Sequence, residues 1–205
     1  MKAMPVKGPG ASFVARFDEA ADDFFESRLR GRRPADLLMY LASAAGEHSF
    51  VWLALAGLQG ARSGRGWKSL ARAALALGAE SALVNGLVKL AFRRSRPELV
   101  PRPPLPLRRP RTSSFPSGHA SAAFFAAALL RRKGGAWPLY YLVAVIVSVS
   151  RLHVRAHHAS DVVAGAALGA VLGEVCRRRF PLDQAIVGEG SPSPLEGQDV
   201  ARDMT

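Results

Sequence analysis

The sequence predicts an all-α integral membrane protein, a helical bundle of about five transmembrane helices preceded by an N-terminal amphipathic helix. Hydrophobic residues make up 49% of the 205 residues and gather in long stretches with few charges, as helices that span a bilayer require. The net charge is +12, and 24 of the 28 bases lie between residues 27 and 180. This basic middle favours an anionic partner, and the apolar stretches favour a membrane rather than a nucleic acid.

Two simpler observations exclude certain kinds of protein. The single cysteine, Cys176, excludes an intrachain disulfide and any multi-cysteine metal site. The first residues, MKAMPVKGPG, lack the apolar core of a signal peptide, so we expect no cleavable signal.

The N-terminal segment, residues 1–36, is predicted to contain one interfacial helix over 17–30. Apolar side chains recur there at helical spacing with acids on the opposite face, as in helices that lie on a membrane surface. They are Phe17, Ala21, Phe24, Phe25 and Leu29. A run of arginines and Pro34 then ends the helix.

The membrane domain is predicted over residues 37–180, and its first two spans over 37–58 and 70–92. Glu47 and His48 interrupt the first span, and polar groups in an apolar span usually have a functional reason. The second span is interrupted by Arg72, Glu80, Asn85 and Lys89.

A loop should follow over 93–116, because half of the 14 prolines lie there. Beyond it, a stretch over 118–130 is short for a span, so it needs a tilt or a thinner bilayer. The stretch over 136–149 carries Trp137, Tyr140 and Tyr141 as an interfacial belt. The stretch over 159–176 repeats glycine every fourth residue, at Gly165, Gly169 and Gly173, which favours close helix packing. Residues 181–205, rich in Pro, Gly, Ser and acids, are predicted to be a disordered tail.

Three polar clusters carry the chemistry. Lys89 is followed seven residues later by Arg96, and a point charge with a planar guanidinium suits phosphate oxygens. Next, Pro116, Ser117, Gly118 and His119 stand where a helix begins, and the free N–H groups of such a terminus bind anions.

The third cluster comprises Ser150, Arg151, His157 and Asp161. If the last helix begins by His157, Asp161 lies one turn further on and its carboxylate can accept the imidazole N–H, which leaves the other nitrogen bare as a nucleophile. A metal site is the alternative, because His153, His157 and Asp161 are spaced like a helical ligand set. Arg151 and Arg155 interleave with these ligands and oppose a divalent cation.

In this order, KLAFRRSRP, FPSGH and SRLHVRAHHASD resemble the signature of the type 2 phosphatidic acid phosphatase family, which shares its site with vanadium-dependent haloperoxidases and bacterial acid phosphatases. The resemblance implies that His157 forms a phosphohistidine, that Asp161 orients it and that His119 protonates the leaving oxygen. It also implies a phosphate cradle, made of Lys89, Arg96, Ser117, Gly118 and Arg151. Cations then stabilise the transferring phosphoryl group, and neither a metal nor another cofactor is required.

The expected activity is hydrolysis of a lipid phosphate by a multi-pass protein of the cell membrane. Candidate substrates are phosphatidic acid, phosphatidylglycerol phosphate, polyprenyl pyrophosphate and polyprenyl-phosphoribose phosphate. A vanadate-dependent haloperoxidase would not need the membrane helices, and a non-catalytic lipid-binding protein would not need His157 and His119. The basic residues place the site in the cytoplasm by count, whereas the resemblance favours the outer face. The sequence leaves the oligomeric state open.

Overall fold

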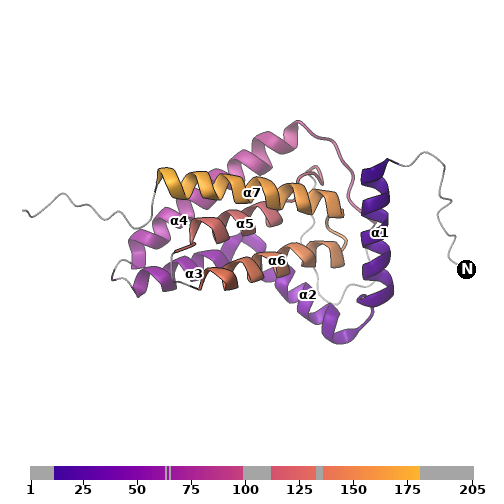
Figure 1. Cartoon of the computed structure of the whole chain (residues 1–205), viewed down its shortest axis with the longest axis horizontal. Helices are drawn as coiled ribbons and strands as arrows, with labels where there is room; N and C mark the ends of the chain where they lie inside the picture. The colour runs from indigo at the N-terminus through magenta and orange to yellow at the C-terminus, as the bar shows by residue number, and fades with distance from the viewer. Residues whose placement is uncertain (1–11, 63, 65, 99–111, 133–135, 181–205) are drawn as a thin grey trace, which may run out of the picture.

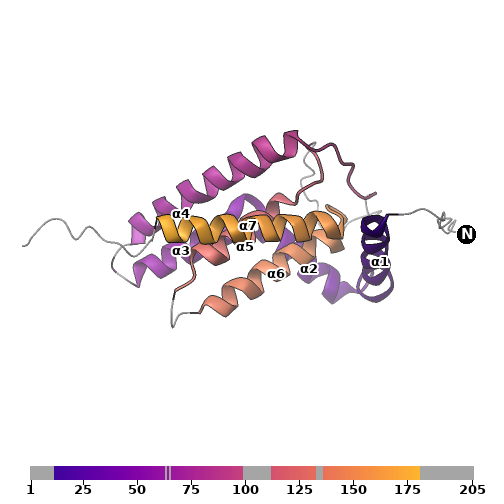
Figure 2. The ribbon, with the colours of Figure 1, turned by 45° about the horizontal axis from the view of Figure 1, so that its top comes forward.

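The computed structural model describes residues 12–62, 64, 66–98, 112–132 and 136–180, and within these ranges every regular element is a helix. The long helices form a bundle, and α1 lies across one end of it (Figures 1 and 2). The helices are α1 (Phe13–Arg28), α2 (Arg33–Ala45), η1 (Glu47–Ser49), α3 (Phe50–Ala61), α4 (Gly66–Ser81), η2 (Ala82–Val88), α5 (Gly118–Leu129), α6 (Trp137–His153) and α7 (Ala159–Arg179). The predicted tail over 181–205 lies outside the described residues.

Helix α5 is the centre of the bundle and contacts α4, α6 and α7. Its side chains are almost all buried, among them Phe125 and Leu129. Because protein rather than lipid surrounds this short helix, its length need not match the thickness of the bilayer. The packing therefore explains how a stretch as short as 118–130 is accommodated.

The predicted glycine stripe packs α7 directly on α5. Gly165, Gly169 and Gly173 are buried, and a Cβ at Gly169 would collide with the backbone oxygen of Ser121. A Cβ at Gly173 would lie 2.9 Å from Ala128 Cβ. The predicted packing role of the stripe is thus confirmed, since only glycine lets these two backbones approach so closely.

The prediction of one continuous helix over 37–58 is wrong. The chain leaves α2 at Gly46, makes the single 3₁₀ turn η1 and enters α3 after Ser49, whose φ of 60° is left-handed. The break places polar groups beside the site, because Ser43 at the end of α2 accepts a hydrogen bond from Arg151. The polar residues that interrupted the apolar pattern therefore mark a turn.

The other predicted helix boundaries lie closer to those of the structure. Helix α1 begins earlier than predicted, at Phe13, and α6 runs on to His153. The predicted span over 70–92 corresponds to α4 continued by the π-helical segment η2. The described parts of the predicted loop, 93–98 and 112–116, contain no helix.

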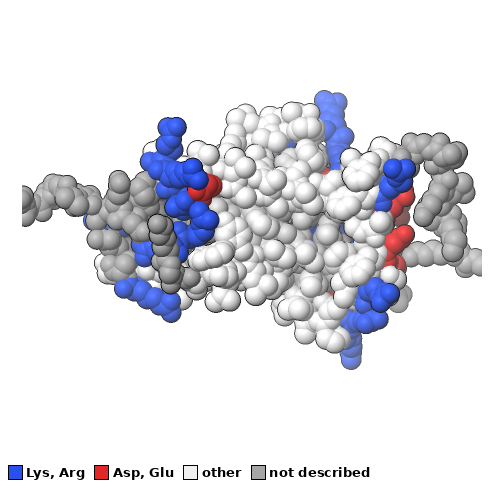
Figure 3. Space-filling model, in the orientation of Figure 1, with Lys and Arg blue, Asp and Glu red and all other residues white. Residues whose placement is uncertain are grey.

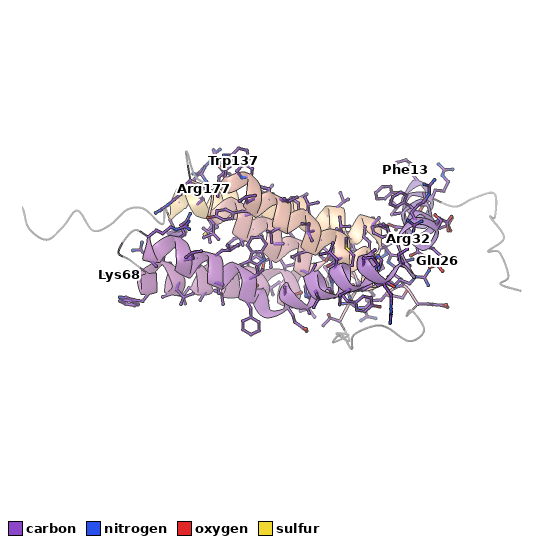
Figure 4. All side chains as sticks on the ribbon, turned by 90° about the horizontal axis from the view of Figure 1, so that it is seen from below. Phe13, Glu26, Arg32, Lys68, Trp137 and Arg177 are labelled. Carbon is purple, nitrogen blue, oxygen red and sulfur yellow. The ribbon has the colours of Figure 1, made fainter. Side chains whose placement is uncertain are left out.

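Charged side chains gather at both ends of the bundle, and an uncharged belt lies between them on the face shown in Figure 3. Large apolar side chains are exposed along the bundle helices, including Leu75, Leu139, Val163 and Val171. Figure 4 shows Lys68, Trp137 and Arg177 at one end and Phe13, Glu26 and Arg32 at the other. Among the described helices, α7 is long and apolar enough to cross a membrane, and α3 and α5 are apolar but shorter.

Candidate active site

The three sequence clusters meet at the end of the bundle that α1 covers. Lys89 follows η2, the residues after it run alongside the segment that enters α5, and the turn between α6 and α7 closes the group. Ser117 caps α5, with its side-chain oxygen 3.4 Å from the backbone nitrogen of Ala120. Ser117 N in turn donates to Asp161 O at 2.9 Å, which ties the start of α5 to the start of α7.

His157 is buried, and its two nitrogens have different partners. Nδ1 lies 2.8 Å from the carbonyl oxygen of Ser114, and Nε2 lies 3.1 Å from Arg96 Nη1. A carbonyl can only accept and a guanidinium can only donate. Nδ1 therefore carries the proton, and Nε2 presents its lone pair toward Arg96.

Asp161 is fully buried but is not the direct partner of His157 that the spacing predicted. The closest approach, from Asp161 Oδ2 to His157 Nδ1, is 3.8 Å, too long for a hydrogen bond. The reason is that α7 begins at Ala159, so His157 stands before the helix and the one-turn relation does not apply. Asp161 instead accepts from Ser114 Oγ, from His158 N at 2.9 Å and from Arg94 Nη1 at 2.6 Å.

The cations predicted to bind phosphate are close to His157. Burial, followed by the charges of Arg96, Arg151 and Lys89, lowers the pKa of His157 to about 4, while the carboxylate of Asp161 acts in the opposite direction. Lys89 and Arg151 are themselves buried. The imidazole is therefore neutral at physiological pH, the form in which it is a nucleophile.

His119 lies in the first turn of α5 and faces the same cations. Its Nε2 is buried and has no hydrogen-bond partner among the described residues. A Cβ at Gly46 would lie 3.5 Å from His119 Cδ2, so the break between α2 and α3 also bounds the site. An unpaired buried nitrogen beside a group of cations is suited to a substrate oxygen.

The alternative metal set does not come together. His153 Nε2 lies 2.8 Å from Asp36 Oδ1 on α2, while Asp161 is turned toward Ser114 and Arg94. Among the described residues, no group of three or more His, Cys, Asp or Glu side chains is placed to hold a metal ion.

Sequence reasoning missed Ser114, Arg94, Asp18 and Ser43 as parts of this site. Ser114 stands three residues before Ser117, outside the motif, and Arg94 is one of several arginines in a basic run. Asp18 belongs to the acidic face of α1 and contacts Arg94 Nη2 at 2.6 Å. The uneven distribution of acids was the available signal, since five of them precede residue 27 and face a basic domain.

A cavity of about 690 Å³ opens between α1 and the turn that carries His157. Its walls include Asp18 and Asp22 on one side and Arg94, Arg155 and His157 on the other. His157 therefore borders a space that α1 helps to enclose, whereas Lys89, Arg96 and Arg151 are not among the residues that line it.

Comparison with known proteins shows which proteins this chain is similar to. The model of the PAP2 superfamily matches residues 69–183. Decaprenylphosphoryl-5-phosphoribose phosphatase of Mycobacterium tuberculosis is 37% identical over 134 residues, which cover 63% of this chain and 72% of that protein. Lipid A 1-phosphatase of Porphyromonas gingivalis is 36% identical over 102 residues, 46% of this chain and 21% of that protein.

One solved structure is similar in fold. It is a transmembrane PAP2 type phosphatidylglycerolphosphate phosphatase from Bacillus subtilis, with a TM-score of 0.61 and 23% sequence identity. The match covers 82% of this chain and 88% of that one.

Proposed function

The chain belongs to the PAP2 superfamily and is a phosphatase of lipid phosphates, and we propose that it works without a metal, through a phosphohistidine on His157. The substrate is a phosphate monoester or a pyrophosphate of a lipid. The observation that carries this proposal is the fixed tautomer of His157, because the carbonyl of Ser114 holds the proton on Nδ1 and leaves Nε2 free to attack.

In the first step, Nε2 of His157 attacks phosphorus while cations and N–H groups bind the non-reacting oxygens. Arg96, Arg151 and Lys89 supply positive charge, and their effect on His157 supports this placement. The Ser117 hydroxyl and the N–H of Gly118 belong to the N-terminus of α5, which favours an anion. Charge that develops on phosphorus is thereby stabilised by groups already in place.

His119 acts as the general acid in this step and protonates the leaving oxygen as the P–O bond breaks. In the second step a water molecule attacks the phosphohistidine, and His119 takes the proton from that water. The unpaired Nε2 of His119 supports this role. Phosphate leaves, and His157 returns to its starting form.

We also propose that five helical segments span the cell membrane, namely α3, α4 with η2, α5, α6 and α7. The uncharged belt between two charged ends supports this arrangement (Figure 3), as does the length of α7. A phosphate site at one end of the bundle then lies at the level of lipid headgroups.

Among the candidate substrates, the relatives favour polyprenyl-phosphoribose phosphate. The curated relative from Mycobacterium tuberculosis is named for the decaprenyl compound of this class. Phosphatidic acid, phosphatidylglycerol phosphate and polyprenyl pyrophosphate are the competitors.

The test is phosphate release by the purified full chain from these four lipids, with EDTA present throughout. We expect turnover in EDTA, inhibition by vanadate, which resembles pentacoordinate phosphorus, and no detectable turnover for His157→Ala. His158→Ala is the neighbouring control: this imidazole contacts Asp161 Oδ2 at 3.3 Å and does not attack phosphorus, so that variant should keep measurable turnover. Activity that disappears in EDTA and returns with zinc or magnesium would contradict the proposal.

A further inference from the structure

Arg94 joins α1 to the carboxylate at the start of α7. Its Nη1 donates to Asp161 Oδ1 at 2.6 Å, and its Nη2 donates to Asp18 Oδ2 at 2.6 Å. The Arg94 side chain is 29% exposed, whereas those of Asp18 and Asp161 are 6% and 0% exposed. A planar guanidinium between two buried carboxylates has a fixed geometry that a lysine could not reproduce.

Asp18 is fixed at the same place by the first turn of α7. Its Oδ1 accepts from Ser160 N at 2.8 Å, and its Oδ2 accepts from the Ser160 hydroxyl at 2.9 Å. The carboxylate therefore satisfies a free N–H group at the start of another helix. This contact helps to hold α1 in its position across the end of the bundle, a position that can be followed in Figure 2.

From Arg94 the contacts continue to the nucleophile. Asp161 Oδ2 accepts from Ser114 Oγ, and the carbonyl of Ser114 accepts from His157 Nδ1 at 2.8 Å. The Arg94 backbone also takes part, since its carbonyl accepts from Ser114 N at 2.9 Å. Arg94 thus holds Ser114 from two sides, and Ser114 fixes the tautomer of His157.

We infer that Asp18 and Arg94 are positioning residues for His157, so that α1 completes the active site of this chain. The inference rests on the proposed role of His157. Asp18 lies outside the residues 69–183 that the superfamily model matches, so the site depends on a helix beyond the matched region.

Charge compensation gives this role a measurable consequence. The groups that face His157 are the cations Lys89, Arg96 and Arg151, the carboxylate of Asp161 and the imidazole of His119. The imidazole of His158 contacts Asp161 Oδ2 at 3.3 Å instead. Arg94 is the cation bonded directly to Asp161. Without it, the negative charge of Asp161 acts more strongly on His157 and raises the pKa of that imidazole from about 4.

The experiment measures kcat, KM and the pH dependence of kcat/KM for Asp18→Asn, Arg94→Lys and Arg94→Ala in the full chain, on one lipid substrate and one aryl phosphate. We expect kcat to fall by about 10- to 100-fold on both substrates, the range typical for loss of groups that orient a reactive side chain. KM should stay within about twofold, because a residue that only orients the nucleophile stabilises the transition state and does not contribute to substrate binding. In Arg94→Ala the acidic limb of the pH profile of kcat/KM should move to higher pH. Because ionisation of the substrate is the same for every variant, such a shift reports on the protein.

Two neighbours serve as matched controls. Glu19 and Arg93 are exposed, and neither side chain makes a hydrogen bond or ion pair with the described part of the chain. Glu19→Gln and Arg93→Ala should therefore resemble the wild type. If Arg94→Ala does not fold, as judged by thermal unfolding in detergent, Arg94→Lys keeps the charge and tests the geometry.

Three results would overturn the inference. The first is an unchanged kcat in Asp18→Asn and Arg94→Ala. The proposed function would still stand in that case if His157→Ala were inactive. A rise in KM with normal kcat would mean that α1 binds substrate instead. Glu19 also borders the cavity. An equal loss of kcat in Glu19→Gln would mean that the overall negative charge of α1, and not the contact between Asp18 and Arg94, affects catalysis. Turnover by His157→Ala would defeat the proposed function itself.

Discussion

The carbonyl oxygen of Ser114 decides which nitrogen of His157 carries the proton. In many sites a carboxylate orients the catalytic histidine directly, but Asp161 here stands 3.8 Å from Nδ1 and acts through Ser114. A neutral carbonyl orients the ring without raising its basicity as strongly as a carboxylate would. The low pKa of His157, about 4, agrees with this arrangement.

His157 and His119, the two histidines proposed to be catalytic, should respond differently to the leaving group. An aliphatic lipid alkoxide must be protonated as it leaves, whereas a nitrophenolate leaves without a proton. His119→Ala should therefore lose about 10²- to 10⁴-fold in turnover on a lipid phosphate monoester and much less on nitrophenyl phosphate. His157→Ala should lose both alike, because attack on phosphorus precedes either departure.

The assay compares release of phosphate and of nitrophenol by the same purified variants. Equal losses on the two substrates for His119→Ala would mean that His119 binds phosphate or supports the loop. The proton donor would then be sought among the remaining titratable groups near the site.

Helices α5 and α7 pack with their backbones in contact, and this packing places Ser117 and Asp161 side by side. A Cβ at Gly165 would collide with the carbonyl oxygen of Ser117, and Ser117 N donates to Asp161 O at 2.9 Å. The same close packing of α5 on α7 therefore includes both the glycine stripe and the residues at the start of the two helices. A larger residue in the stripe should separate Ser117 from Asp161.

Gly169→Ala should lower the thermal midpoint of the purified protein in detergent. Overpacking costs about 1–3 kcal/mol, which exceeds the gain of about 1 kcal/mol in helix propensity from Gly to Ala. Gly78→Ala is the matched control, since its Cβ would meet no atom within 4 Å, and that variant should be as stable as the wild type or more so. If Gly169→Ala melted no lower than Gly78→Ala, the close packing of α5 on α7 would not contribute to stability.

The distribution of charge gives the bundle two distinct ends. The site, α1 and Arg32 lie at one end, and Lys68, Trp137 and Arg177 lie at the other (Figures 1 and 4). An apolar belt between them supports the proposed membrane-spanning arrangement, in which the two ends face opposite aqueous compartments.

Labelling of single cysteines should reveal this orientation. In a Cys176→Ser background, Arg93→Cys reports on the site end and Arg179→Cys on the far end of α7. A membrane-impermeant maleimide should label one of the two in intact cells and both after permeabilisation. Labelling of both in intact cells would contradict a membrane-spanning bundle, and the variant that reacts identifies the side of the site.

The sequence predicted which clusters meet at one end of the bundle better than it predicted how their side chains connect. The three clusters converge because each stands at the end of a helix, and helix ends can be located from prolines, caps and polar interruptions. Contacts between segments far apart in sequence, such as Asp18 with Arg94, leave no local pattern. The exact start of α7 decided whether His157 could reach Asp161, and helix boundaries are the least certain part of such predictions.

The contact between Asp18 and Ser160 spans 142 positions of the chain. Asp18 is synthesised well before Ser160, so α1 reaches this partner only after the start of α7 has emerged. On the proposed role of His157, a nascent chain gains the contacts that position this residue only once α1 and α7 have met. The active site is then completed by the contact with the longest separation in sequence rather than by its local motifs.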